Sequence, residues 1–118
     1  MGKIILGLTE KVLIIGKNKE EIIARIDTGA TSSSIDLKLA EKLDLGPIMK
    51  SKIVKSASGV KKRPIIKSLV RIRGVEVEEE FTLADRSHMT YPVLIGQNIL
   101  IRGNFLIDPS KWKQQSYH

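Results

Sequence analysis

The sequence predicts a mostly-β domain with one or two short helices, formed by residues 1–118 as a single unit. Its length of 118 residues suits one compact domain. Apolar residues occur in short runs or alternate with charged residues, a pattern typical of strands. Only one longer segment combines helical spacing of leucines with start and stop signals. Aromatic residues make up 4% of the chain, so the core must be built from isoleucine, leucine and valine.

The first half of the chain is predicted to hold three strands and one helix. The strands cover residues 3–8, 11–16 and 20–27, and the helix lies within residues 36–46. Two residues separate the first two apolar runs, as in a hairpin, and a Gly-Lys-Asn turn follows. Asp36 can cap the start of the helix, and Gly46-Pro47 ends it.

The second half is predicted to hold two hairpins, a buried strand, a helical turn and a last strand. In order, they cover residues 48–69 with a tip at 56–59, 68–84 around Gly74, 91–96, 96–103 and 104–110. The second hairpin alternates apolar and charged residues, so one of its faces should be wet. The run "YPVLIG" is unbroken and apolar, which indicates a strand buried on both faces.

Composition limits the possible functions. The chain has no cysteine, which excludes disulfides, thiolate nucleophiles and cysteine-bound metals and suits the cytoplasm. No stretch approaches the roughly 20 apolar residues of a membrane span, so no membrane partner is expected. The net charge of +7 indicates either solubility or an anionic partner. Nucleic acid is disfavoured as that partner, because the few aromatic residues form no stacking motif.

The segment "ARIDTGATSSS" at residues 24–34 holds the candidate site. It places Asp27 directly after an apolar strand, where a carboxylate is costly to bury without a role or a partner. Asp-Thr-Gly alone is a weak signal, because an aspartate two residues before a glycine is common in turns. The context strengthens it, because small hydroxyl residues follow, and "PVLIGQN" comes much later in the chain.

The chain resembles the retropepsin group of aspartic proteases. The resemblance rests on "IDTGATSSS" and the later "VLIGQNIL", and a basic hairpin at residues 50–66 falls where that group carries its flap. The segment "ADRSHMTYPVLIGQNILIRGNFLIDPSK" is similar to the RimK-associated, RimB-like family known as ATP-dependent zinc proteases. That family is linked to ATP-grasp ligases that append glutamates to a ribosomal protein. The resemblance implies an acid protease barrel with its active site at a homodimer interface.

Aspartic peptidase chemistry needs two carboxylates that share one proton. The ionised member takes a proton from water, and the protonated member hydrogen-bonds the substrate carbonyl. Only Asp27 stands in such a motif, because no other aspartate of the chain precedes Thr-Gly or Ser-Gly. The second carboxylate is therefore expected to be Asp27 of a second copy, at a two-fold axis.

The resemblance implies roles for the residues around Asp27. Thr28 would hydrogen-bond across the dimer, and Gly29 would let backbone approach the substrate. Substrate contacts are implied for Ala30, Thr31, Ser58, Gly59 and Arg86. The alternative for Arg86 is that it caps backbone in a loop before the buried strand. Gly96 would allow the crossing strand to pass closely beneath the motif.

The chain departs from many viral members of the group at two positions. Those members carry aspartate after Asp-Thr-Gly-Ala and arginine after the later glycine, and the two form a salt bridge. Here the positions are Thr31 and Gln97, so both charges are absent together and neither is left unpaired. This leaves open which contacts stabilise a dimer.

No metal or other cofactor is expected, despite the zinc in the family label. The chain has two histidines, His88 and His118, and no His-Glu-x-x-His motif. The expected partners are a second copy and a peptide substrate, with a glutamate-rich tail favoured by the basic hairpin, and a functional link to an ATP-grasp glutamate ligase. The alternative function is a non-catalytic module that binds an acidic peptide on the same fold.

Overall fold

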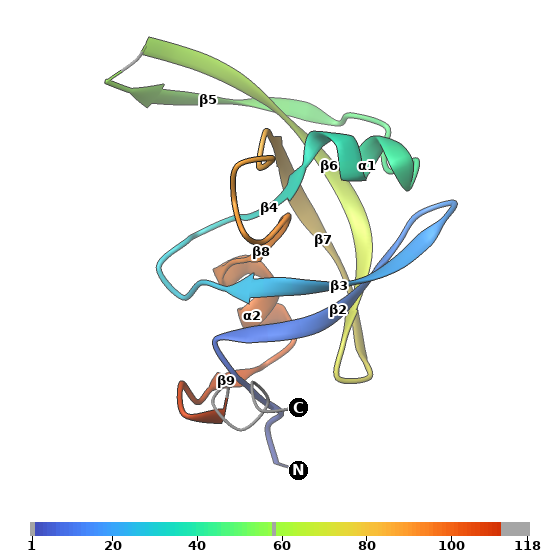
Figure 1. The fold of residues 1–118 in the computed structure, drawn as a ribbon, viewed down its shortest axis with the longest axis vertical. Coiled ribbons are helices and arrows are strands. Elements are labelled where there is room, and N and C mark those ends of the chain that lie inside the picture. Colours follow the sequence, from blue (N-terminus) through green and yellow to red (C-terminus); the bar gives the residue numbers. More distant parts are fainter. Residues whose placement is uncertain (1, 58, 112–118) are drawn as a thin grey trace.

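The structure, a computed structural model, describes residues 2–57 and 59–111 (Figure 1). Its elements in chain order are β1 (Ile5–Leu6), β2 (Thr9–Ile15), β3 (Lys19–Ile26), β4 (Ser33–Asp36), α1 (Leu37–Lys42), β5 (Lys50–Ser56), β6 (Gly59–Ile72), β7 (Val75–Ala84), β8 (Val93–Ile95), α2 (Gln97–Arg102) and β9 (Leu106–Ile107). The predicted mostly-β class with two short helices is confirmed. No helix among the described residues is long and apolar enough to cross a membrane.

Six strands close into a barrel. Neighbours pair in the order β2, β3, β8, β4, β7 and β6, and β6 pairs back onto β2 to complete the ring. The barrel interior is aliphatic as expected, with Ile14, Ile35, Val70 and Ile95 fully buried beside the one buried large aromatic of the barrel strands, Phe81. Each such side chain contributes roughly 1.5–3 kcal/mol by leaving water.

One long strand joins the barrel to an arm. Residues 65–72 of β6 pair with β7, and part of them with β2, whereas residues 59–64 pair only with β5, from Ser51↔Pro64 to Ser56↔Gly59. We call this arm, formed by β5 and residues 59–64, the flap; it projects at the upper left of Figure 1. The predicted hairpin over residues 48–69 is thereby confirmed.

The hairpin of β6 and β7 turns where predicted. Arg73 and Gly74 form its two-residue loop and have φ angles of 52° and 79°. Positive φ at both positions is the geometry whose twist matches that of paired strands.

Two expectations about local structure were wrong. β1 does not form a hairpin with β2; it pairs in parallel with β9 across the chain. Asp36 precedes α1 without a side-chain capping bond, because its carboxylate instead accepts the backbone N–H of Arg86 at 2.8 Å. A third element was missed, because no element was predicted for the hydroxyl-rich residues after the Asp-Thr-Gly motif, yet Ser33–Asp36 forms β4 between β8 and β7.

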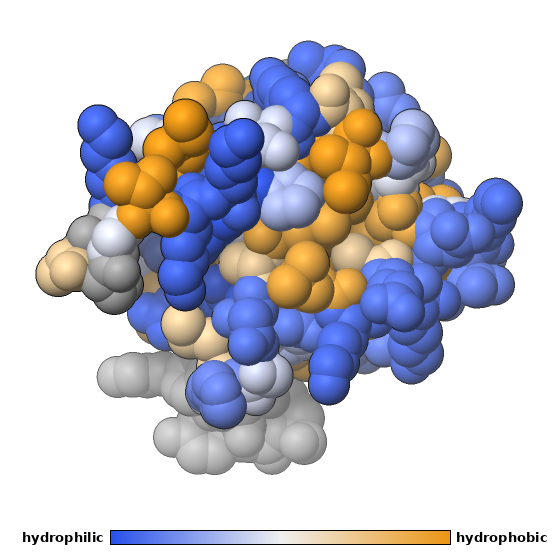
Figure 2. Space-filling view, turned by 90° about the horizontal axis from the view of Figure 1, so that it is seen from above, coloured by the Kyte–Doolittle hydropathy of each residue, from blue (hydrophilic) through white to orange (hydrophobic). Residues whose placement is uncertain are grey.

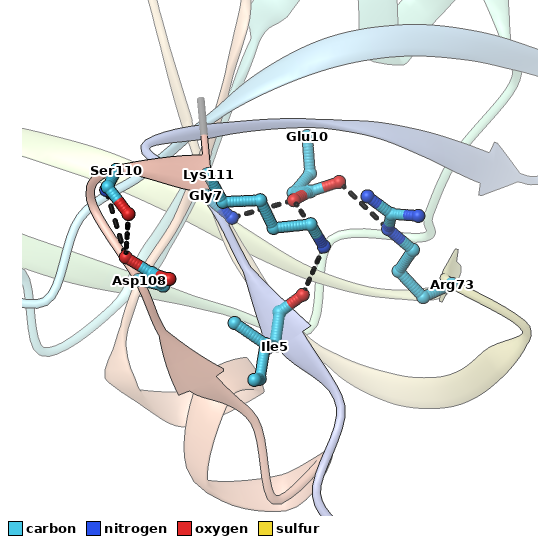
Figure 3. A network of polar contacts seen from close by, with 7 residues as sticks. All are labelled: Ile5, Gly7, Glu10, Arg73, Asp108, Ser110 and Lys111. Carbon is cyan, nitrogen blue, oxygen red and sulfur yellow. Dashed lines mark hydrogen bonds and ion pairs between the residues drawn. The ribbon is translucent and has the colours of Figure 1, made fainter. Parts of the chain in front are cut away.

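A buried carboxylate fixes the terminal strands to the barrel (Figure 3). Glu10 is only 4% exposed and accepts the N–H of Gly7 at 2.7 Å and the Nε of Arg73 at 3.1 Å. The Nζ of Lys111 lies 3.6 Å from the same carboxylate and also donates to the carbonyl of Ile5. The N–H of Gly7 is thus engaged by Glu10.

Replacing Glu10 by Gln should lower the free energy of unfolding by roughly 1–3 kcal/mol, because a buried site with two cations loses its charge. Urea denaturation measures the effect. The matched control is Glu21→Gln, which removes an exposed ion pair with Lys11 at 3.8 Å and should cost below about 1 kcal/mol. Equal losses of unfolding free energy in the two variants would show that the contacts of Glu10 stabilise the fold no more than an exposed ion pair does.

Candidate active site

Asp27 directly follows β3, the strand that lies between β2 and β8 in the sheet. Its backbone N–H donates to the carbonyl of Ile95 at 2.9 Å, which continues the parallel pairing of Ile26 with Ile95. Side chains alternate along a strand, and Ile26 faces the core at 6% exposure. Asp27 is therefore turned the other way, half-buried at the surface of the barrel.

The Asp27–Ala30 loop is closed on itself and held from below. The Oδ1 of Asp27 accepts the N–H of Gly29 at 2.9 Å, and the carbonyl of Asp27 accepts the N–H of Ala30 at 3.3 Å. Gln97, the first residue of α2, donates its side-chain amide to the carbonyl of Thr28 and its N–H to that of Ala30, both at 2.8 Å. These bonds fix the direction of the Asp27 carboxylate.

Gln97 therefore has a role that the sequence did not reveal. It was treated as half of a lost ion pair with Thr31, whereas its amide reaches the carbonyl of Thr28 within the same chain. An amide can donate to a carbonyl without needing a charged partner. The neutral residue thus keeps a contact between the helix and the motif.

Gly96 lets β8 pass directly beneath the loop, as expected. A Cβ atom at this position would lie 2.2 Å from the carbonyl oxygen of Ser32 and 2.9 Å from that of Ala30. Real Cβ atoms do not approach backbone oxygen so closely. Any larger residue at position 96 must displace the loop that carries Asp27.

A buried polar chain supports this crossing. Ser33 is fully buried; its hydroxyl accepts the N–H of Gly96 at 2.9 Å and donates to the Oδ1 of Asn98 at 2.7 Å. Asn98 in turn donates to the carbonyl of Glu80 at 3.0 Å and to the carboxylate of Glu79 at 3.2 Å. Sequence reasoning missed both Ser33 and Asn98, because the serine run offered no signal for which hydroxyl is buried.

A hollow of about 540 Å³ separates the motif loop from the flap, and we call it the flap hollow. Its lining comprises residues 29–34, Lys52, Ile53, Val54, Lys55, Arg63, Thr82 and Leu94. The Nζ of Lys52 reaches the hydroxyl of Ser32 at 3.5 Å, so the two sides approach each other. Figure 2 looks down on the flap at its left, where hydrophilic side chains lie beside exposed apolar ones. Ile53 and Val60 are the exposed large apolar residues of the flap.

The structure places the predicted substrate-binding residues unequally. Ala30 and Thr31 line the flap hollow, as does the predicted catalytic residue Gly29. Gly59 begins β6 at the end of the flap and is not among the lining residues. Ser58 lies outside the described residues.

Arg86 is anchored in the loop before β8. Its Nε donates to the carbonyl of Tyr91 at 3.0 Å and its Nη1 to the hydroxyl of Ser34 at 3.2 Å. Burial lowers the pKa of Arg86, Asp36 opposes that shift, and the charges of Arg25 and Asp27 also act on it. These contacts fit the capping alternative, and the guanidinium still lies within electrostatic reach of Asp27.

A second, smaller hollow of about 210 Å³ is lined in part by the end of β3, directly before the motif. It is lined by Leu8, Thr9, Arg25, Ile26 and Tyr91. We call it the arginine hollow. In the chain, Asp27 and Thr28 lie between Arg25 and Ile26 of the arginine hollow and residues 29–34 of the flap hollow. Such an order is expected where an extended peptide crosses a catalytic group.

Within residues 2–57 and 59–111, no three His, Asp or Glu side chains gather closely enough to hold a metal ion. His88 lies in the exposed loop before β8, and His118 falls beyond the described part of the chain.

Comparison with protein families matches residues 38–117 to the RimB-like family, described as retropepsin-like aspartic endopeptidase RimB. The matched segment begins after the Asp-Thr-Gly motif. The motif therefore supports the assignment independently of the match. A comparison with curated proteins found no similar sequence.

Solved structures with the same fold include proteins of bacterial and viral origin. Lpg0085 from Legionella pneumophila, a DUF785 protein of unknown function, is 22% identical with a TM-score of 0.69 over 92% of this chain and 95% of its own. The EIAV protease complexed with the inhibitor HBY-793 is 19% identical with a TM-score of 0.65, covering 82% of this chain and 88% of its own. The simian foamy virus (mac) protease is 18% identical with a TM-score of 0.62, covering 79% and 91%. These likenesses show a retropepsin-like fold.

Proposed function

The chain belongs to the RimB-like family of retropepsin-like aspartic endopeptidases, and we propose that it hydrolyses peptide bonds with Asp27 as its catalytic carboxylate. The proposal is carried by one observation, namely that neighbouring elements hold the loop of Asp27 in place. Its loop is fixed by Ile95 and Gln97 while the carboxylate itself faces the surface. Rigid support of a reactive group from regular elements is what catalysis requires.

The proposed site is completed by a second copy of the chain. The other aspartates within the described residues have local partners: Asp36 accepts from Arg86, Asp44 pairs with Lys17, Asp85 accepts from Ser87 and Asp108 accepts from Ser110. The serine hydrogen bonds lower the pKa of both Asp85 and Asp108, which makes them poor proton carriers. Since none of the four stands in an Asp-Thr-Gly motif, we infer that the second catalytic carboxylate is Asp27 of a second copy, across a two-fold axis.

In such a pair, one carboxylate is ionised and its partner is protonated. The ionised Asp27 removes a proton from water, whose oxygen attacks the peptide carbonyl carbon, while the protonated Asp27 gives its proton to the carbonyl oxygen. The Asp27 that took a proton from water then gives it to the amide nitrogen, a hydroxyl of the tetrahedral intermediate returns its proton to the other Asp27, and the C–N bond breaks. The two protons are redistributed within the pair, so no metal is needed to balance the step.

We further propose that the substrate is acidic, such as a glutamate-rich tail. The flap carries Lys52, Lys55, Lys61, Lys62 and Arg63, and a homodimer would double them. Lys52, Lys55 and Arg63 line the flap hollow itself. Cations around a cleft raise the local concentration of anionic ligands and their association rate.

Glutamate-rich peptides should be cleaved with a higher kcat/KM than matched glutamine-rich peptides, and raising salt from about 50 to 500 mM should erase most of that advantage. The double variant Lys52→Gln/Lys55→Gln should reduce the preference, whereas the control Lys11→Gln on β2 should not. Equal rates for both peptides at all salt concentrations would contradict an acidic substrate. Tight peptide binding without any turnover would instead support the binding-module alternative.

The cytoplasm is the proposed compartment because the chain has no cysteine to exploit an oxidising one. A link to an ATP-grasp glutamate ligase is proposed from the family resemblance.

A further inference from the structure

A cation without an acidic partner stands beside Asp27. The side chain of Arg25 forms no ion pair or hydrogen bond with the described residues, unlike Lys11 and Arg71 on other barrel strands, which pair with Glu21 and Glu76. Arg25 lies two positions before Asp27, which corresponds to about 7 Å along the strand direction. Alternation turns both side chains to the same, outward face.

The surroundings of Arg25 are defined by the central part of the sheet. Its backbone is flanked by Thr9 on β2 and by Leu94 on β8. With Leu8, Ile26 and Tyr91 it lines the arginine hollow. The walls are thus largely apolar, and the guanidinium is the single charged group among the lining residues.

This combination suits one kind of side chain. Apolar walls favour methylene groups, and a guanidinium binds a carboxylate through two parallel hydrogen bonds. A glutamate side chain has both features, whereas a lysine would meet a like charge and a leucine would leave the guanidinium without an anion. The distance to Asp27 corresponds to the spacing of side chains on one face of an extended peptide.

A second guanidinium reinforces this field. Arg86 is held by Tyr91, a lining residue of the arginine hollow, and by Ser34. The like charge of Arg25 contributes to the lowered pKa of Arg86, after the larger effect of burial. An anion bound at Arg25 would relieve this repulsion between the two arginines.

We infer that Arg25 determines substrate specificity by binding the carboxylate of a glutamate next to the scissile bond, in the arginine hollow. This inference rests on the proposed peptidase function, and it differs from the general attraction by the flap. The flap lysines act over a distance and accept any acidic segment. Arg25 acts at one substrate position.

The test uses two peptides that differ only by Glu or Gln at the residue beside the mapped cleavage site. Arg25→Gln should lower kcat/KM for the Glu peptide by roughly 10- to 100-fold and leave the Gln peptide within about 3-fold, since a charged hydrogen bond is lost from one substrate only. Arg25→Lys should restore part of the preference, and Arg25→Glu should favour a Lys peptide. The matched control Lys11→Gln should leave both rates unchanged.

Binding supplies a readout that does not need turnover. In an Asp27→Asn background, the Glu peptide should bind more tightly than the Gln peptide, and Arg25→Gln should remove the difference. Equal losses for both peptides, or no loss for either, would overturn the role of Arg25. If sedimentation shows a weakened dimer and equal losses, Arg25 is an interface residue instead.

The catalytic role of Asp27 and the specificity role of Arg25 can be rejected independently. Hydrolysis that survives Asp27→Asn would reject the aspartic mechanism, whatever the Arg25 variants show. Hydrolysis that depends on Asp27 but ignores Arg25 would reject only the specificity role.

Discussion

Replacing Asp27 by Asn is expected to abolish peptide hydrolysis while leaving the fold intact. The amide has the shape of the carboxylate, and its oxygen can still accept the N–H of Gly29, now at 2.9 Å from Oδ1. It can neither take a proton from water nor share one with a partner carboxylate. Loss of the general base alone is worth roughly 10²–10⁴-fold, and a homodimer of the variant loses both the base and the acid. Chromatography of peptide products and a thermal melt measure the two effects.

The matched control is Asp44→Asn. Asp44 has a φ of 54°, a conformation that asparagine also adopts readily, and its ion pair with Lys17 is exposed. This variant should keep full activity. Hydrolysis by the Asp27 variant, or inhibition by a chelator that zinc reverses, would contradict the aspartic mechanism.

The second large effect is expected for Gly96→Ala. The new methyl group would have to occupy space 2.2 Å from the carbonyl oxygen of Ser32. Backbone on both sides is fixed, because Ile95 pairs with Ile26 and Gln97 donates to Ala30. The motif loop must therefore move away from β8, at a cost of roughly 3–5 kcal/mol in the free energy of unfolding.

Gly29→Ala is the contrast for this prediction. A Cβ atom at Gly29 would meet only the Oδ1 of Asp27, at 3.4 Å, so the fold should lose less than about 1 kcal/mol. Chemical denaturation of both variants measures the difference. A Gly96→Ala variant as stable as the Gly29→Ala variant would show that β8 and the loop are not in close contact.

Strands that pair with near neighbours could be predicted from the sequence. The alternation from residue 75 to 83 and the Arg73-Gly74 turn specify the β6–β7 hairpin locally. The parallel pairing of β1 with β9 depends on contacts between the two ends of the chain, which no local pattern encodes. β4 was missed for a similar reason, because Ser33 is buried only through partners at Gly96 and Asn98.

In the candidate site, too, some residues could be predicted from the sequence and others could not. Asp27 could be found from its motif, because the chemistry needs that residue type in that loop. Gln97 could not be assigned correctly, since its partner is the carbonyl of Thr28, 69 residues away. Arg25 carried no signal, because an arginine in an alternating strand is ordinarily a solvated side chain and only the arginine hollow sets it apart.

The central claim is that two chains together form one catalytic site. Wild-type protein should be refolded together with increasing amounts of the Asp27→Asn variant, and hydrolysis measured at constant wild-type concentration. If one functional Asp27 from each chain is needed, mixed dimers are inactive, and a ninefold excess of variant should lower the rate to about one tenth. A rate that does not change with added variant would show that each chain acts alone.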